Sequence, residues 1–107
     1  MSAMEPTTET VSMAELAQRC AQAMWENDYA SRGLGMKIEE IGPGYARLSM
    51  RVRQEMLNGH ATCHGGFIFT LADSAFAFAC NSANRVTVAS AASVDFVAPA
   101  RVDDLLM

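Results

Sequence analysis

The chain of 107 residues lacks the features that define several large classes of protein. It contains only three cysteines, an odd number without the spacing of a disulfide framework, so we expect reduced thiols. No run of basic residues is present, and twelve acidic side chains outnumber eight basic ones. The resulting formal net charge of −4 argues against nucleic acid as the main partner.

Long hydrophobic segments are also missing. The longest apolar stretch, residues 67–80, contains a carboxylate and is shorter than the roughly 20 apolar residues of a membrane-spanning helix. The chain does not open on a basic segment followed by an apolar one, which is the pattern of a secretory signal. We therefore expect a cytoplasmic protein that does not associate with membranes.

What is present fits one small domain. Residues 1–11 combine Pro, Thr and Glu without an apolar pattern, and we expect a disordered tail there. Residues 12–107 are predicted to form a single domain. Ser12 followed by Glu15 fits a helix N-cap, and apolar residues at three- and four-residue spacing predict a helix from Met13 to about Tyr29.

A β-hairpin is predicted after this helix. Residues 35–41 are a strand candidate, and Gly42-Pro43-Gly44 is a turn signal. Residues 45–53 alternate between apolar side chains and a second set with three arginines, as in a half-buried strand with a solvated arginine face. The predicted inner face has Ala46, Leu48, Met50 and Val52, and the outer face has Tyr45, Arg47, Ser49, Arg51 and Arg53.

The last third of the chain predicts further strands. Residues 86–97 are rich in Val, Ala and Ser and are followed by Pro99, which favours a strand that ends there. Residues 103–107 are typical of the beginning of another strand. Three strands are too little sheet to cover a helix that is apolar all round, so we expect the natural protein to continue with more strands.

The stretch 58–80, NGHATCHGGFIFTLADSAFAFAC, organises the rest of the chain. It joins a polar, glycine-bearing loop to a segment that is apolar on almost every side. Such a helix is buried or paired with another copy of itself. Asp73 lies in the middle of it and must be satisfied, neutralised or used, because burying an unpaired charge costs several kcal/mol.

His64-Gly65-Gly66 opens this predicted helix. The unpaired N–H groups of a helix N-terminus can hold a carbonyl oxygen that becomes an oxyanion, although a glycine turn with a structural histidine has the same sequence. Asp73 lies eight residues after Gly65, about 12 Å along a helix axis, whereas donor and base must both approach one carbonyl to about 3 Å. Two antiparallel copies of the helix would bring the two groups together, which predicts a two-fold dimer with composite sites. By its residue type alone, Asp73 could equally be a buried carboxylate bonded to a neighbour.

The joint pattern of motifs resembles a known family. It consists of LNGH at 57–60, CHGG at 63–66, LAD at 71–73 and ACNS at 79–82. These motifs are similar to those of the hot-dog-fold acyl-CoA thioesterases, specifically the PaaI type of phenylacetic acid degradation. The closing strand at 89–96 is similar as well, and the resemblance covers roughly residues 20–107.

The resemblance implies an α+β hot-dog fold, in which a curved antiparallel β-sheet wraps a long central helix. It implies homodimers that join their sheets edge to edge and usually pair into homotetramers. The implied substrates are acyl-CoA thioesters, especially phenylacetyl-CoA and its ring-hydroxylated relatives, which are hydrolysed to the free acid and CoA. No metal or cofactor is expected, because a thioester has a good leaving group.

The resemblance also assigns four catalytic positions in this sequence. Asp73 matches the carboxylate that acts as general base on water or as nucleophile. The N–H of Gly65 matches the oxyanion donor, and His64 matches the neighbour that orients the thioester. Asn58 matches the loop residue that positions the water or the thioester.

Three further positions are expected to contact substrate, namely Gly66, Phe67 and Ser90. Some relatives place a serine on the strand after the helix, where this chain has Ala89 with Ser90 beside it. The phenylalanines between 67 and 78 either line an aromatic acyl pocket or pack in the core.

Other functions remain open from the sequence. A hot-dog hydratase or dehydratase would use His64 as its base with Asp73 as helper, and a non-catalytic acyl-CoA-binding module would not hydrolyse its ligand. Cys63 beside His64 suggests two further interpretations, a metal site or a catalytic Cys/His pair. Adjacent loop side chains diverge, however, and no second motif completes a metal site.

Overall fold

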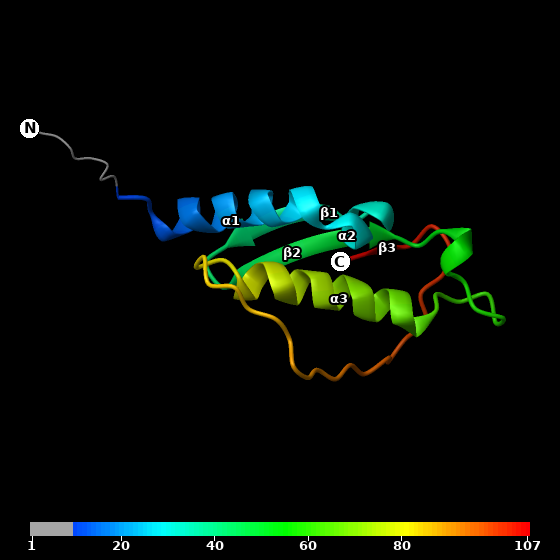
Figure 1. The fold of residues 1–107 in the computed structure, drawn as a ribbon. Helices are drawn as coiled ribbons and strands as arrows, with labels where there is room; N and C mark the ends of the chain where they lie inside the picture. The colour runs from blue at the N-terminus through cyan, green and yellow to red at the C-terminus, as the bar shows by residue number, and fades with distance from the viewer. Residues whose placement is uncertain (1–9) are drawn as a thin grey trace, which may run out of the picture.

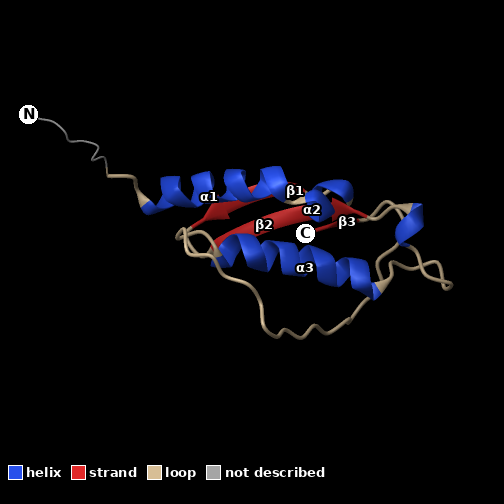
Figure 2. Ribbon diagram, viewed as in Figure 1, coloured by secondary structure: helices blue, strands red, loops and turns tan. Residues whose placement is uncertain are grey.

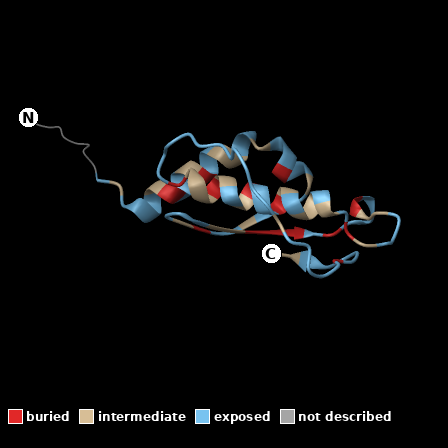
Figure 3. Cartoon of the chain, turned by 90° about the horizontal axis from the view of Figure 1, so that it is seen from below, coloured by how far each residue is buried: buried red, intermediate tan, exposed pale blue. Residues whose placement is uncertain are grey.

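The described structure, residues 10–107 of a computed structural model, places three α-helices on one face of a small antiparallel sheet (Figures 1 and 3). The expected tail at 1–9 lies outside the described residues. Figure 2 shows how the helices and strands alternate with loops along the chain. The elements are α1 (Met13–Asn27), α2 (Tyr29–Gly33), β1 (Lys37–Gly42), β2 (Tyr45–Arg51), the 3₁₀ turn η1 (Gln54–Met56), α3 (Gly65–Cys80) and β3 (Leu105–Leu106).

The predicted hairpin and the predicted strand near residue 105 are confirmed. The sheet has the order β1-β2-β3, and both neighbouring pairs are antiparallel. β1 and β2 are joined by a turn in which Gly44 has a φ of +66°, a conformation that glycine adopts without strain. β3 pairs with the far end of β2, where Leu106 lies opposite Met50.

Helix α1 begins as predicted but ends earlier. The Ser12 hydroxyl oxygen accepts a hydrogen bond from the Glu15 N–H at 3.1 Å, as an N-cap does. The helix stops at Asn27 rather than near Tyr29, because Asp28 leaves the helical conformation. Asp28 instead caps α2, where its carboxylate accepts from the Ser31 N–H.

One residue of the predicted solvated face of β2 is buried. The pairing of β1 with β2 slips between Ile38 and Glu40, so Glu39 is an extra residue in its strand. Ser49, predicted to face solvent, is buried, and its hydroxyl donates to the Glu39 carboxylate at 2.6 Å. The alternation of β2 by itself does not predict this burial, because the partner side chain comes from the extra residue of the neighbouring strand.

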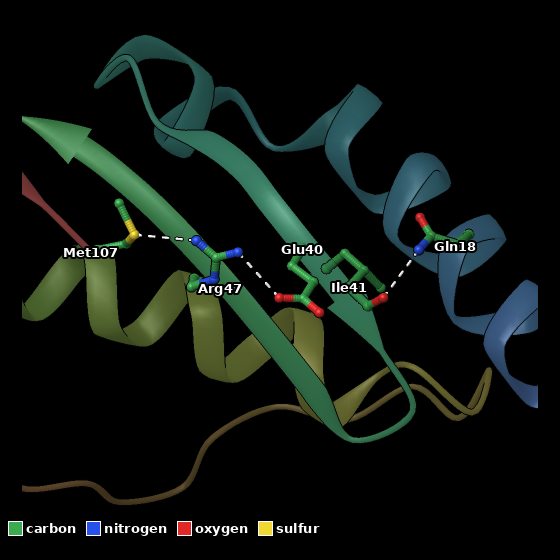
Figure 4. A network of polar contacts seen from close by, with 5 residues as sticks. All are labelled: Gln18, Glu40, Ile41, Arg47 and Met107. Atoms are coloured by element: carbon green, nitrogen blue, oxygen red, sulfur yellow. Dashed lines mark hydrogen bonds and ion pairs between the residues drawn. The ribbon is translucent and has the colours of Figure 1, made fainter.

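The arginines of β2 remain at the surface, and Arg47 links three parts of the chain (Figure 4). Its guanidinium contacts the Glu40 carboxylate at 3.1 Å and the Met107 sulfur at 3.3 Å. The hydrogen bond to Glu40 raises the pKa of Arg47 above its ordinary value. On the other side of β1, the Gln18 amide donates to the Ile41 carbonyl oxygen at 3.0 Å, which holds α1 against the strand.

Helix α3 packs on the sheet through only one of its faces. Leu71, Ser74 and Phe78 are buried, and the ring of Phe78 lies 6.2 Å from that of Trp25 in α1. The opposite face, which includes Asp73, is exposed. The interpretation of Asp73 as a buried carboxylate bonded to a neighbour is therefore wrong.

The strand predicted over 86–97 does not form in the described structure. The segment is extended and exposed along most of its length, and it runs along α3 on the side away from the sheet (Figure 1). Its start is held where the Thr87 N–H donates to the Asn81 side-chain oxygen at 2.8 Å. A strand requires a hydrogen-bonded neighbour, and none of the strands within residues 10–107 pairs with this segment.

Replacing the buried Phe78 with alanine should lower the free energy of unfolding by about 3–5 kcal/mol, because a large core side chain leaves a cavity. Urea denaturation followed by circular dichroism measures the loss. Tyr29→Ala is the control, because that side chain is 75% exposed. Its loss should stay below about 1 kcal/mol, and equal losses in the two variants would contradict this account of the core.

Candidate active site

The loop before α3 is built around Asn58. The Asn58 side-chain oxygen accepts from the His60 N–H at 2.9 Å and from both the N–H and the hydroxyl of Thr62 at 3.2 Å. The loop closes with a single bridge between Leu57 and Cys63. Because the oxygen of Asn58 is occupied, only its NH₂ group remains for a ligand.

His64 caps the N-terminus of α3. Its ring Nδ1 accepts a hydrogen bond from the Gly66 backbone N–H at 3.1 Å. The backbone N–H of His64 donates to the Met56 carbonyl oxygen. With Nδ1 as acceptor, the neutral imidazole carries its proton on Nε2, so the exposed side of the ring presents a donor. The ring also stands edge-on to Phe67, with the ring centroids 6.4 Å apart.

The Gly65 N–H is the first of α3, and no acceptor for it is found among residues 10–107. Such a group at the positive end of a helix attracts a carbonyl oxygen or an anion. The ring of Phe96 lies against Gly65, and a Cβ at position 65 would lie 3.0 Å from its Cζ atom. Phe96 was not identified from the sequence, because a residue distant in the chain gives no signal of this contact.

Gly65 and Asn58 face a common hollow of about 430 Å³. Residues 96–100 form its other wall. The structure thus brings together two of the four predicted catalytic residues, with His64 adjacent to Gly65 in the chain.

Asp73 opens onto different hollows on the outer face of α3. One, of about 360 Å³, is lined by Phe69 and Phe76 of the helix and by residues 91–94. The other, of about 300 Å³, includes Cys80 and residues 87–89. Neither shares a lining residue with the hollow at Gly65, and the uninterrupted helix maintains the predicted separation of about 12 Å along its axis.

The three predicted substrate contacts are dispersed. Gly66 is exposed beside His64, and Phe67 is half-buried against the core. Ser90 is exposed on the extended segment, but Ser93 is the serine that lines the hollow at Asp73. Counting residues could not distinguish the two serines, since the path of this segment depends on packing.

Cys63 lies beneath the loop rather than in a reactive position. It is 6% exposed, and burial raises the pKa of its thiol. Between residues 10 and 107, no three His, Cys, Asp or Glu side chains gather as a potential metal site. No helix in that range combines the length and apolar character of a membrane span.

Comparison with known proteins identifies the family. A family model described as the thioesterase superfamily matches residues 60–107. The acyl-coenzyme A thioesterase PaaI of Escherichia coli (strain K12) is 47% identical over 94 residues, covering 88% of this chain and 67% of that protein. The chain belongs to the PaaI-type acyl-CoA thioesterases, a family of hydrolases.

A solved structure of this family agrees with the chain in fold. The solved structure of the E. coli PaaI protein, from the phenylacetic acid degradation operon, superposes with a TM-score of 0.86 at 46% identity. The match covers 88% of this chain and 68% of that one, and it confirms the predicted α+β hot-dog fold. A putative esterase of Archaeoglobus fulgidus is 38% identical over 82% of this chain and 57% of its own length. The chain thus spans between about half and two thirds of these curated relatives.

Alkylation should distinguish Cys63 from the other two thiols. Because its pKa is raised and its sulfur is shielded, iodoacetamide at mildly alkaline pH should modify it more slowly than the half-buried Cys20 and Cys80. The protonated, buried Cys63 thiol contributes to the stability of the folded state at neutral pH. That contribution is lost as the pH rises through the raised pKa of the thiol. Mass spectrometry of native and urea-unfolded samples gives the rates. Equal native rates at the three cysteines would refute the shielding.

Proposed function

We propose that the chain hydrolyses acyl-CoA thioesters, with phenylacetyl-CoA and its ring-hydroxylated relatives as preferred substrates. Family membership supports the reaction type. The observation that carries the proposal is the Gly65 N–H, which opens α3 without an acceptor among residues 10–107, at a residue that lines a hollow together with Asn58. This donor suits the thioester carbonyl oxygen, whose negative charge grows as the tetrahedral intermediate forms.

His64 and Asn58 supply further donors to this end of α3. The His64 ring directs an Nε2–H outward, because Nδ1 is occupied by the Gly66 N–H. The Asn58 NH₂ group is free of the contacts that hold its oxygen. Both groups suit the orientation of a thioester or a water molecule.

The tautomer of His64 also disfavours the alternative hypothesis that the chain is a hydratase or dehydratase with His64 as its base. A general base needs a free lone pair within reach of the proton that it removes. In His64 that lone pair is the one on Nδ1, which faces the Gly66 N–H at 3.1 Å. Hydrolysis with Asp73 as the base agrees better with this arrangement.

Asp73 is proposed as the carboxylate that acts on water or attacks the carbonyl. Its side chain is exposed, and no ion pair or hydrogen bond engages it among residues 10–107. In the general-base route, the carboxylate takes a proton from water, and the hydroxide adds to the carbonyl carbon. Collapse of the intermediate breaks the C–S bond, and the CoA thiolate leaves and takes up the proton.

A second copy of the chain is needed for both groups to act on one carbonyl. Gly65 and Asp73 face separate hollows in one protomer, as described above. An antiparallel α3 of a second protomer would place its Asp73 near Gly65 of the first, and two-fold symmetry would repeat the site. The exposed outer face of α3 and the unpaired segment 86–97 support such a dimer, and pairing of dimers into a homotetramer stays a prediction.

The aromatic preference rests on the hollow at Asp73. Phe69 and Phe76 lie one on each side of the carboxylate along α3, and both are among the exposed large apolar residues. Two alanines, Ser93 and a valine of residues 91–94 complete the lining together with Ala72 of the helix. An apolar, partly aromatic wall favours an aryl acyl group over a charged one.

Asp73→Asn should lower kcat for phenylacetyl-CoA by at least about 100-fold, because the amide cannot accept the proton of water. Release of free CoA thiol measures turnover, and titration with a non-hydrolysable acyl-CoA analogue measures binding. Binding should persist in the variant. Unchanged turnover would remove Asp73 from the mechanism, and a wild-type chain that binds but never releases thiol would favour the non-catalytic binding module.

Mixed dimers test whether the site is shared. Gly65→Pro removes the N–H at a position where proline is tolerated in helices, and Gly65→Ala is the control that adds a Cβ but keeps the donor. A dimer of one Asp73→Ala chain and one Gly65→Pro chain rebuilds one intact composite site and should retain about half of the wild-type turnover. Two inactive homodimers whose mixture shows no recovery would contradict sharing.

A further inference from the structure

A buried polar contact joins α3 to the junction of α1 and α2. The hydroxyl oxygens of Ser74 in α3 and Ser31 in α2 lie 2.6 Å apart. The Ser31 hydroxyl also lies 2.7 Å from one carboxylate oxygen of Asp28, and the Ser31 N–H donates to the other at 3.0 Å. Ser31 and Ser74 are only 1% and 8% exposed.

The direction of these hydrogen bonds follows from the number of protons. An ionised Asp28 can only accept, so the single hydroxyl proton of Ser31 is donated to it. The short contact to Ser74 must then use the Ser74 proton, which is donated to the Ser31 oxygen. The three residues form a chain of donation from Ser74 through Ser31 to Asp28.

This arrangement is unusual for a hydroxyl inside a helix. Serine and threonine in helix interiors commonly donate to the carbonyl four residues earlier, as Thr70 does to Gly66 at 2.8 Å. Ser74 instead donates its hydroxyl proton to Ser31 of another helix, α2. Within residues 10–107, it is the only side chain of α3 that hydrogen-bonds to another helix or strand.

The contact constrains the rotation of α3 about its own axis. Leu71 and Phe78 also hold the helix on the sheet, but apolar packing is non-directional and tolerates small rotations. A hydrogen bond restricts both distance and angle. Successive side chains of a helix are about 100° apart, so anchoring Ser74 inward determines the direction in which its neighbour Asp73 points.

We propose that Asp28, Ser31 and Ser74 form a positioning relay that holds α3 in the rotation at which Asp73 faces its substrate. The inference rests on the proposed function, in which Asp73 is the reacting carboxylate. Ser74 and Ser31 touch no substrate and act through Asp73. Loss of the relay should therefore reduce the chemical step more than binding, since small errors in alignment lower kcat strongly.

Alanine variants with a matched control test the relay. Ser74→Ala and Ser31→Ala should each lower kcat for phenylacetyl-CoA about tenfold with KM within about twofold, and the double variant should lose no more than the larger single loss. Ser49→Ala is the control, because Ser49 is equally buried and bonded to a carboxylate, Glu39, but has no contact with the relay. It should lower the melting temperature comparably while leaving kcat unchanged. Equal kcat losses in all three single variants would overturn the proposal in favour of general destabilisation.

A spectroscopic measurement separates this inference from the proposed function. The ¹³Cγ signal of Asp73 should shift in Ser74→Ala but not in Ser49→Ala. The measurement needs no turnover, so it decides on the relay even if the wild-type chain hydrolyses no thioester. An Asp73 signal unchanged in Ser74→Ala would refute the relay. If Ser74→Ala does not fold, Ser31→Ala, which removes the other hydroxyl of the same contact, replaces it with the same expected shift.

Discussion

The packing of α3 on β2 through a single face is the constraint on which the rest of the structure depends. Leu71 and Phe78 point into the core, where Phe78 meets Trp25 of α1. Burying that face turns Asp73 and its aromatic neighbours outward and leaves the N-terminus of the helix open beside the Asn58 loop. Both halves of the proposed chemistry therefore derive their positions from one helix.

Two kinds of interaction determine the position and the rotation of α3. Apolar contacts hold it on the sheet, and the hydrogen-bonded serines couple its rotation to the junction of α1 and α2. At its N-terminus, the His64 cap occupies the Gly66 N–H and leaves the Gly65 N–H open. A capping interaction thus also selects which backbone group is available to a ligand and which tautomer the histidine adopts.

Local rules predicted much of this architecture. The Ser12 cap, the hairpin with Gly44 and the helix that opens at Gly65 all depend on residues a few positions apart, and all three are present. Predictions that depended on distant partners were less accurate. Ser49 is buried because a bulge brings Glu39 over it, and the segment 86–97 is no strand because no described neighbour pairs with it.

The sequence by itself determined the family, through the joint spacing of motifs between Leu57 and Ser82, and the separation of Gly65 from Asp73, through the fixed rise of a helix. Only the tertiary structure decided that Asp73 is exposed, that Phe96 lies against Gly65 and that Ser74 meets Ser31. The physical reason is that spacing along a helix is local geometry. Which face is buried, and what lies opposite it, depends on elements that meet only when the chain folds.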